Sequence, residues 1–294
     1  MESNLDDAPA IAGRSVIITG GGSGIGEACA ALLAAQGAAV TICGRTEAKL
    51  AAAGERIAAG AKHGGRVHHV VADVTVEGDV IRLVAATLEQ DGRLDGVVAN
   101  AGGGGGFGPY HLQDTAEFVR VLHLNVLGTM LMVKHTVTHL VSAGSGSFVA
   151  MSSIAGHLTH PHFGAYTVGK AGIEQIVRNA ADEYGEAGVR FNAVRPGFIA
   201  TELMELIPRD SAVYESYVAN TPLGGVGEPE DVAQLVRFLL GPESRWITGQ
   251  VINIDGGHSL RRGPDFSSFI EPVIGHDALI GRAPAAPPAP TPSP

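Results

Sequence analysis

Residues 15–26 read SVIITGGGSGIG, a short apolar run that leads into a glycine-rich loop and then into a segment of helical character. In such a loop Gly20 permits a tight turn, Gly24 lets the backbone approach a pyrophosphate, and Gly26 allows close contact between helix and strand. The helix N-terminus offers free N–H groups and positive potential to the anion. We therefore predict a dinucleotide-binding loop with contacts from Gly20, Ser23, Gly24, Ile25 and Gly26.

The spacing of this loop is Gly-x3-Gly-x-Gly rather than the commoner Gly-x-Gly-x2-Gly. No Lys-Ser or Lys-Thr pair follows the loop, which excludes a Walker-type nucleotide site. Taken in isolation, the loop could also be a glycine-rich turn without function. Its place between a strand and a helix favours the phosphate-binding interpretation.

The rest of the chain repeats this alternation of short apolar runs and longer helical segments. The runs are rich in β-branched residues and apolar along their length, which is typical of parallel strands covered on both faces. They lie at 15–19, 39–43, 67–71, 96–99, 147–151, 189–194 and 250–254. Helical patterns lie at 25–36, 47–59, 77–90, 115–141, 165–184 and 229–239.

This alternation predicts one α/β domain, a doubly wound seven-stranded parallel sheet with helices on both faces, over residues 1–260. Residues 261–294 form a C-terminal extension. Its last dozen residues, 283–294, are almost all Ala and Pro and cannot pack a core. We expect disorder at that end and order at most around 266–274.

The composition of the chain excludes several classes of binding partner. The chain has 20 Lys and Arg against 30 Asp and Glu, a net charge of −10, which argues against nucleic acid and anionic membranes. Its start shows no signal peptide, and no apolar run is long enough to span a membrane. Only Cys29 and Cys43 are present, which suits a reducing cytoplasm. His157, His160 and His162 lack a nearby carboxylate or thiol, so we expect loop or pocket roles for them and no metal.

The second predicted strand ends in Cys43-Gly44-Arg45-Thr46. In dinucleotide folds an acidic residue at this strand end holds the adenosine ribose, whereas an Arg there can meet a 2′-phosphate. Gly44 takes the place of the acid and Arg45 follows. We therefore expect NADP(H) to be preferred, with NAD(H) still open. A solvated loop Arg is the alternative for Arg45 considered alone.

Tyr166 and Lys170 are four residues apart in the predicted helix 165–184, so they share one helix face. A phenol has a pKa of about 10, and a neighbouring ammonium lowers it toward working pH, which suits a proton donor. Ser153 follows the fifth strand at the ligand-binding edge of such sheets, where its hydroxyl could hold a carbonyl oxygen. A Tyr/Lys pair by itself also occurs on solvated helices. Together with Ser153 and the phosphate loop, it indicates an active site.

These pieces together resemble the short-chain dehydrogenase/reductase family, over about residues 12–258. The family motifs occur in order as Thr19-Gly20-x3-Gly24-Ile25-Gly26, Asp73-Val74, Asn100-Ala101-Gly102, Asn125, Ser153, Tyr166-x3-Lys170, Pro196-Gly197-x3-Thr201 and Asp255-Gly256-Gly257. The resemblance implies a Rossmann-type fold and hydride transfer between a nicotinamide cofactor and an alcohol or carbonyl carbon.

The resemblance also implies roles for single residues. Tyr166 would be the acid–base residue, Lys170 would lower its pKa and hold the nicotinamide ribose, and Ser153 would orient the substrate oxygen. Asn125 would position a proton-relaying water, although a helix Asn satisfied by its own turn is the simpler reading. Cofactor contacts would come from Asp73 and Val74 at the adenine, from Asn100, Ala101 and Gly102 on the adenosine side, from Pro196 and Gly197, and from Ile199 and Thr201 at the carboxamide.

Family members are usually homotetramers, so a homotetramer or dimer is expected, joined through the helices that carry Asn125 and Tyr166. The chain departs from the family in its uninterrupted glycine run, 102–106, which we expect to be mobile. It also extends beyond the usual end of the family's short members.

The substrate pocket should be lined by the segment after Ser153 and by residues 202–220. The candidates are Ile154, Leu158, Phe163, Leu203, Met204, Leu206, Ile207, Tyr214 and Tyr217. They suggest an apolar substrate that is lipid-like, terpenoid, steroid or 3-oxoacyl in nature, unless they merely pack the loop. A non-catalytic NADP(H)-sensing regulator is the main alternative function, and the intact Tyr/Lys pair argues against it. Lys170 argues against a dehalogenase-like lyase, and the Tyr–Lys spacing argues against an enoyl reductase.

Overall fold

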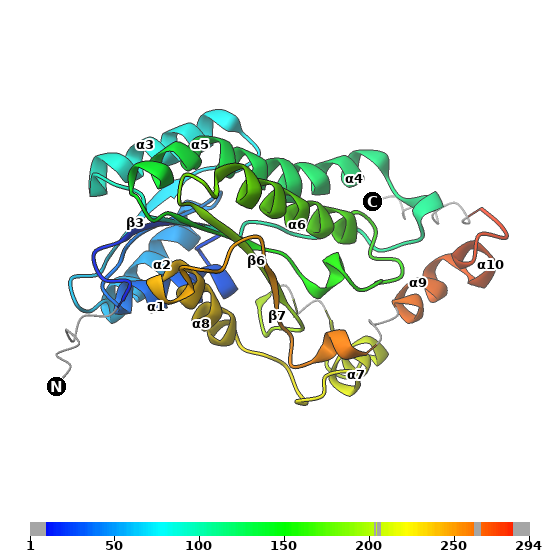
Figure 1. Cartoon of the computed structure of the whole chain (residues 1–294). Helices are drawn as coiled ribbons and strands as arrows, with labels where there is room; N and C mark the ends of the chain where they lie inside the picture. Colours follow the sequence, from blue (N-terminus) through cyan, green and yellow to red (C-terminus); the bar gives the residue numbers. More distant parts are fainter. Residues whose placement is uncertain (1–9, 203, 205–206, 262–265, 285–294) are drawn as a thin grey trace.

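A computed structural model describes residues 10–202, 204, 207–261 and 266–284 as seven parallel strands sandwiched between helices (Figure 1). The strand order is β3-β2-β1-β4-β5-β6-β7, so the chain reverses its winding direction between β1 and β4. This confirms the predicted fold class. The strands are β1 (Ser15–Thr19), β2 (Ala39–Gly44), β3 (Arg66–Val71), β4 (Gly96–Ala99), β5 (Ser147–Met151), β6 (Arg190–Pro196) and β7 (Val251–Ile254).

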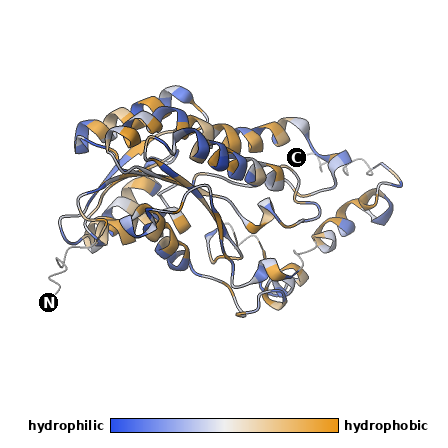
Figure 2. Ribbon diagram, viewed as in Figure 1, coloured by the Kyte–Doolittle hydropathy of each residue, from blue (hydrophilic) through white to orange (hydrophobic). Residues whose placement is uncertain are grey.

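Two helical layers cover the sheet. One face carries α1 (Gly24–Ala35), α2 (Glu47–Gly60) and α8 (Pro229–Leu240), and the other carries α3 (Glu77–Asp91), α5 (Gly128–Ser142) and α6 (Ala165–Tyr184) (Figure 1). A capping box between Glu228 and Asp231 starts α8, with Pro229 in its first turn. Figure 2 shows the apolar sides of these helices turned toward the sheet.

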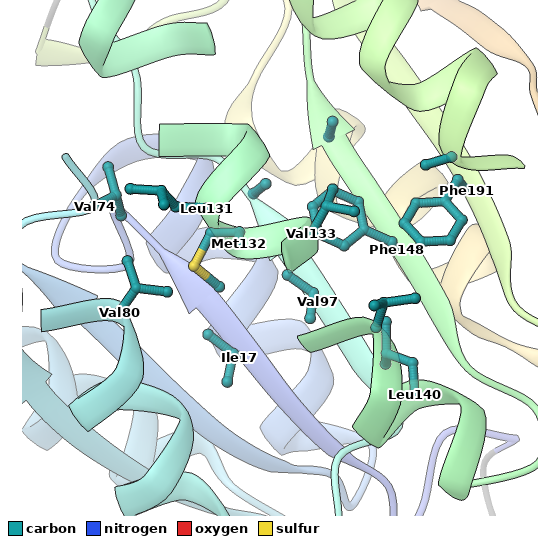
Figure 3. Packing of buried hydrophobic residues seen from close by; sticks show 14 of the residues in the cluster. Ile17, Val74, Val80, Val97, Leu131, Met132, Val133, Leu140, Phe148 and Phe191 are labelled. Carbon is teal, nitrogen blue, oxygen red and sulfur yellow. The ribbon is translucent and has the colours of Figure 1, made fainter. Parts of the chain in front are cut away.

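Side chains of the central strands divide the core between the two layers. In β1, Ile17 packs with the α3 and α5 layer, whereas Val16 and Ile18 pack with the α1 and α8 layer. Successive residues of a strand point to opposite faces, so a strand buried on both faces must be apolar throughout. On the side of Ile17 the core also contains Met132 of α5 and Phe148 of β5. The ring of Phe148 stacks on that of Phe191 with the ring centres 5.2 Å apart (Figure 3).

The exceptions are the two edge strands, β3 and β7, both predicted from the sequence to be covered on both faces. That prediction is wrong. In β3, Arg66 and Val71 are exposed and the intervening residues are mostly half-buried, and in β7 no residue is fully buried and Asn253 is exposed. β3 stands at the edge of the sheet and pairs only with β2, so neither layer reaches fully over it.

The predicted helix 115–141 consists of three parts. α4 (Thr115–Leu122) passes through a π-helical turn, His123–Leu127, into α5. The whole stretch, Thr115–Ser142, is long and apolar enough to cross a membrane by length and composition alone. In this fold Leu131, Met132 and Leu140 pack into the core, which accounts for much of its apolar character.

Among the described residues the structure has three α-helices that the sequence does not predict. One of them, His276–Leu279, lies beyond the stretch 266–274 to which order in the extension was expected to be limited, so that limit is wrong. α7 (Ala212–Ala219) follows the crossover from β6, and α9 (Ser267–Ile274) and α10 (His276–Leu279) belong to the C-terminal extension. In Figure 1 these two helices lie at the end of the sheet where the strands terminate. The division at residue 260 into a domain and an extension stays a prediction.

Candidate active site

Three adjoining cavities lie at the carboxyl ends of the strands. The central cavity, of about 560 Å³, is lined by the glycine loop, the ends of β4 to β6, Ser153, Tyr166 and Lys170. A second cavity, of about 300 Å³, shares Gly20 and Gly102 with it and extends to Arg45, and we call it the Arg45 cavity. A third, of about 320 Å³, shares Ser153 and Tyr166 with the central one, and we call it the aromatic cavity.

The glycine loop has no room for side chains. Gly20 has a φ of +67°, and a Cβ there would lie 2.9 Å from Asn100 Nδ2. A Cβ on Gly26 would collide with the Gly20 carbonyl oxygen. Asn100 holds the turn by donating from Nδ2 to the carbonyl oxygens of Thr19 at 3.0 Å and Gly20 at 3.2 Å. Ser23 precedes α1 without capping it through its side chain, so that hydroxyl does not occupy the first N–H groups of α1, and Ser23, Gly24 and Ile25 line the central cavity. The loop thus fits a pyrophosphate.

The Arg45 cavity carries both signs of charge. Arg45, Lys49 and Asp73 line it, and Lys49 Nζ is already paired with Glu202 at 2.8 Å. The Asp73 carboxylate accepts hydrogen bonds from Thr75 N at 2.9 Å and Thr75 Oγ1 at 2.7 Å. Arg45 is exposed, and none of the carboxylates in the described residues forms an ion pair with it. The guanidinium is therefore available to an anion.

Ser153, Tyr166 and Lys170 converge on the central cavity. β5 ends at Met151, so Ser153 lies two residues beyond the strand, where its Oγ accepts a hydrogen bond from Ala155 N at 3.2 Å. Tyr166 lies in the first turn of α6. Lys170, one turn later and 4 % exposed, donates from Nζ to the Met151 carbonyl oxygen at 2.8 Å. Its Nζ lies 5.5 Å from the centre of the Tyr166 ring.

Burial dominates the acid–base properties of this group. It raises the pKa of Tyr166, and the hydrogen bond with Ser153 lowers that pKa in part. Burial also lowers the pKa of Lys170 to about 8. The sequence analysis expects the ammonium to lower the pKa of the phenol. In this structure the ammonium is committed to the Met151 carbonyl, and the Ser153 hydroxyl is the group that favours the phenolate.

Asn125 stands behind the central cavity rather than in its wall. It lies in the π-helical turn and is fully buried, and its Nδ2 donates to the carbonyl oxygens of Gly103 at 2.8 Å and Val121 at 2.9 Å. A Cβ on Gly102 would lie 2.8 Å from Asn125 Oδ1 and 3.0 Å from Lys170 Nζ. Asn125 therefore holds the start of the glycine run against α6, the helix that carries Lys170.

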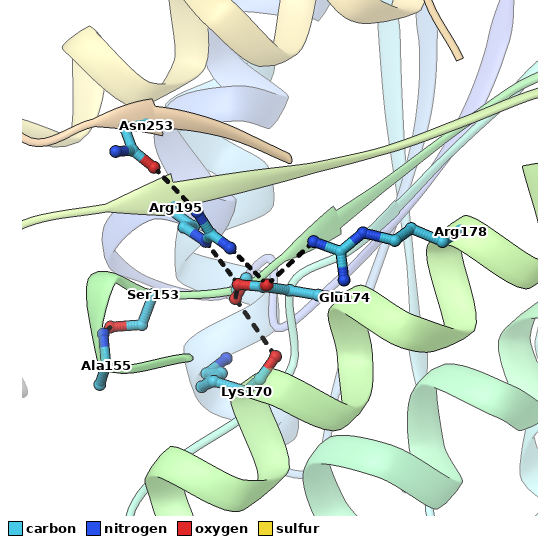
Figure 4. A network of polar contacts seen from close by, with 8 residues as sticks. Ser153, Ala155, Lys170, Glu174, Arg178, Arg195 and Asn253 are labelled. Carbon is cyan, nitrogen blue, oxygen red and sulfur yellow. Dashed lines mark hydrogen bonds and ion pairs between the residues drawn. The ribbon is translucent and has the colours of Figure 1, made fainter. Parts of the chain in front are cut away.

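A buried ion pair that the sequence analysis missed joins α6 to β6 (Figure 4). Glu174 accepts two hydrogen bonds from Arg195, from Nε and Nη2, both at 2.6 Å. Glu174 also accepts from Ser152 Oγ at 2.8 Å, and Ser152 Oγ contacts the Lys170 carbonyl at 3.3 Å. The pair thereby ties the segment carrying Ser153 to the helix carrying Lys170.

The aromatic cavity includes a residue from the C-terminal extension. Phe266, fully buried, stacks on Phe107 with ring centres 4.8 Å apart and lies 5.1 Å from Phe163. Phe163 in turn stacks on Tyr166 at 4.7 Å. The sequence analysis did not find Phe107 or Phe266. Their signal was an isolated Phe after a glycine run and another in a polar, proline-containing extension.

The predicted site residues are distributed as follows. The central cavity is lined by Gly20, Ser23, Gly24, Ile25, Asn100, Ala101, Gly102, Ser153, Tyr166, Lys170, Pro196, Gly197, Ile199 and Thr201. Arg45, Asp73 and Val74 line the Arg45 cavity. Gly26 and Asn125 line neither cavity and support these walls from behind.

Of the predicted substrate-pocket residues, five line the aromatic cavity, namely Ile154, Phe163, Met204, Ile207 and Tyr217. Leu158 instead lines a separate groove with Tyr110 and His157, which we call the outer groove. Tyr214 packs edge-on against Phe198, with ring centres 5.3 Å apart. Leu203 and Leu206 lie outside the described residues. Within the described ranges, no three His, Cys, Asp or Glu side chains gather as metal ligands.

Comparison with known proteins gives the family. A family model described as "Enoyl-(Acyl carrier protein) reductase" matches residues 20–259. A cis-4-hydroxycyclohexanecarboxylate dehydrogenase from Sinomonas cyclohexanicum is 36% identical over 85% of this chain and 98% of its own length.

Solved structures agree. A short-chain type dehydrogenase/reductase from Mycobacterium ulcerans has a TM-score of 0.89 and 46% identity, covering 91% of this chain and 98% of that one. A 7α-hydroxysteroid dehydrogenase, solved with NADH and 7-oxo glycochenodeoxycholic acid, has a TM-score of 0.80 and 28% identity, covering 87% of this chain and 98% of that one.

Proposed function

Because the chain belongs to the short-chain dehydrogenase/reductase family and is an oxidoreductase, we propose that it moves a hydride between NADP(H) and a carbonyl or secondary alcohol carbon of an apolar, cyclic compound. One observation carries the proposal. Tyr166 and Ser153 line both the cavity that continues into the glycine loop and the aromatic cavity on its other side. A substrate oxygen between these two residues would lie between a dinucleotide groove and an apolar chamber.

The residues present fit such a cofactor, which when bound supplies or accepts the hydride. Tyr166 would donate a proton to the substrate oxygen in reduction and take the hydroxyl proton in oxidation. Ser153 would orient that oxygen through its hydroxyl. Lys170, one turn further along α6 in the wall of the same cavity, would hold the nicotinamide ribose. The glycine loop and the N-terminus of α1 would hold the pyrophosphate.

The proposed preference for NADP(H) rests on charge. Arg45 lines its cavity without an ion-pair partner among the described residues, whereas Lys49 is paired with Glu202, and the acidic lining residue Asp73 accepts hydrogen bonds from Thr75. A 2′-phosphate would meet Arg45 where an acidic residue would otherwise bind the ribose hydroxyls. The steroid dehydrogenase among the similar structures was solved with NADH, so NAD(H) is the alternative that the assay must compare.

The proposed substrate is cyclic and largely apolar. The aromatic cavity is walled by Phe107, Phe163, Phe198 and Phe266. Two similar proteins are named for ring compounds, a hydroxycyclohexane carboxylate and a bile-acid steroid. The family model that matches is described as an enoyl reductase. We favour carbonyl chemistry, because Ser153 and Tyr166 offer hydrogen bonds to an oxygen rather than a surface for a carbon–carbon double bond.

We further propose a homotetramer in the cytoplasm. Val119 of α4, Met130 and Val141 of α5 and Val168 of α6 are exposed apolar residues on the helices that the family resemblance assigns to subunit contacts. Both cysteines are free and fully buried, as expected for a reducing compartment. Sedimentation of the purified chain tests the assembly. A monomer at micromolar concentration would contradict it.

A spectrophotometric assay tests the function. The protein is mixed with NADPH or NADH and a panel of cyclic ketones, linear ketones and one enoyl thioester, and reduced nicotinamide is followed by absorbance. We expect cyclic ketones to be reduced, and the matching alcohols to be oxidised with the oxidised cofactor. If neither direction proceeds while the cofactor still binds, a cofactor-sensing role replaces the enzymatic one. Selective reduction of the enoyl thioester would replace carbonyl chemistry.

A further inference from the structure

We propose that His160 recognises a second polar group of the substrate, a hydroxyl that donates a hydrogen bond to its Nε2 in the aromatic cavity. The substrate class would then be hydroxylated cyclic ketones and the corresponding diols. This rests on the proposed function, because it refines what the same site takes.

His160 is a polar side chain set into an apolar wall. It is 5 % exposed, and its ring lies 6.1 Å from that of Phe163 and 6.4 Å from that of Tyr217. It lines the aromatic cavity together with Ser153 and Tyr166. Burial lowers the pKa of His160 to about 4, so the imidazole is neutral near pH 7.

The backbone selects its tautomer. Nδ1 lies 3.0 Å from the Leu158 carbonyl oxygen, which can only accept a hydrogen bond. In a neutral imidazole Nδ1 must therefore carry the proton, and Nε2 is left with a lone pair. His160 thus presents an acceptor and no second donor.

His160 lines both the aromatic cavity and the outer groove, and we assign its free acceptor to the aromatic cavity. Among the described residues, no group forms a hydrogen bond with His160 Nε2, yet this atom is not one of the side-chain atoms sealed away without a partner. Buried acceptors without a partner are unfavourable, so this position favours a ligand that brings a donor. Tyr217, also 5 % exposed, lines the same cavity and offers a phenol beside it.

The charges around the cavity favour a neutral hydroxyl over an acid. A carboxylate would place its negative charge against a lone pair. The described lining of the cavity includes no Lys or Arg to compensate it, and Glu117, the acidic lining residue, already holds Arg120 at 2.6 Å. A second ketone brings no hydrogen to donate. A hydroxyl satisfies Nε2 and is neutral.

The test compares cyclohexanone with 3- and 4-hydroxycyclohexanone and with 1,4-cyclohexanedione. In the parent protein we expect the better hydroxy ketone to exceed cyclohexanone in kcat/KM by about tenfold, as the gain of one buried hydrogen bond implies, and the dione not to do so. His160→Leu should abolish that preference by raising KM for the hydroxy ketone about tenfold more than KM for cyclohexanone. His160→Gln, whose amide oxygen can accept, should restore part of it.

His157→Leu is the matched control, because His157 is exposed and lines the outer groove instead of the aromatic cavity. Equal kcat/KM for all four ketones in the parent, or a preference that survives in His160→Leu, would overturn the subsite and leave the proposed function standing. If no ketone is reduced, the proposed function fails. Ligand-observed NMR with 4-hydroxycyclohexanone then tests the subsite alone, and equal binding to parent and His160→Leu would reject it.

Discussion

The rings of Phe107 and Phe266 stack with centres 4.8 Å apart and planes 18° from parallel. This contact joins the end of the glycine run to the C-terminal extension, far away in sequence, and closes the aromatic cavity beside Tyr166. A second contact, between His162 Nε2 and Ser267 Oγ at 3.1 Å, fastens the start of α9 to the same region.

Removing this wall should change substrate selection. Phe266→Ala should raise KM for small cyclic ketones about tenfold and improve activity on bulkier ones, because the ring bounds the cavity; it should also cost about 3 kcal/mol of stability. Val273→Ala lies in α9, the helix that Phe266 precedes, but Val273 is 80 % exposed, and the change should alter neither the size preference nor the stability. Steady-state kinetics over a size series of ketones is the measurement, and an unchanged size preference would remove Phe266 from the pocket wall.

Tyr166→Phe tests the proton donor. Loss of the hydroxyl should lower kcat by a factor of about 100 or more, because general acid catalysis contributes about that much. Affinity for NADPH should stay nearly unchanged, since the ring remains. Titration of the variant with NADPH checks binding and single-turnover assays check chemistry. Retained activity would exclude Tyr166 as the acid–base residue.

Arg45→Ala tests the cofactor preference. The variant should bind NADPH about tenfold more weakly, and NADH as before, because an exposed phosphate–guanidinium contact is lost. Arg245→Ala, an exposed Arg away from the three cavities, serves as control. Both affinities are measured by fluorescence titration. Equal affinity of the parent for the two cofactors would contradict the assignment of the 2′-phosphate.

The lowered pKa of Lys170 predicts a pH dependence of stability. Lys170 has a pKa of about 8 in the folded protein and an ordinary pKa of 10.5 in the unfolded chain. The unfolded chain therefore binds the extra proton between these two values, so stability rises with pH across that window. Denaturant melts should show the parent gaining about 2 kcal/mol over Lys170→Met between about pH 7.5 and pH 9.5. Titration of other groups is common to both proteins and cancels. If the difference in stability between the parent and Lys170→Met did not change with pH, the pKa of Lys170 would not be lowered in the folded protein.

The ion pair between Glu174 and Arg195 predicts a structural defect. Glu174→Gln leaves the guanidinium buried without its counter-charge and should destabilise the protein by about 3 kcal/mol. Arg178 makes a longer contact to Glu174, 3.6 Å from Nη2 to Oε2, and its side chain is 46% exposed. Arg178→Ala removes only this contact and should destabilise the protein by well under 1 kcal/mol. Thermal melts compare the stability of the two variants. Equal destabilisation by both would show that the buried ion pair contributes no more to stability than the exposed contact.

Local features of the chain determined the scaffold. The glycine loop, the alternation of apolar runs with helical segments and the Tyr166–Lys170 spacing each depend on backbone preferences or on neighbours within a few turns. For this reason the predicted strands and helices agree with the structure to within two residues at most ends. Seven-stranded parallel topology follows from the same alternation.

Only the tertiary structure decided which distant side chains meet. The exposure of β3 depends on its place at the sheet edge, and Asn125 lies behind the glycine run, in a π-helical turn that interrupts the helix. Phe266 reaches Phe107, and Glu174 reaches Arg195, across long separations in sequence. Such pairings leave no local pattern, because they arise from the packing of whole elements and not from the preferences of any one segment.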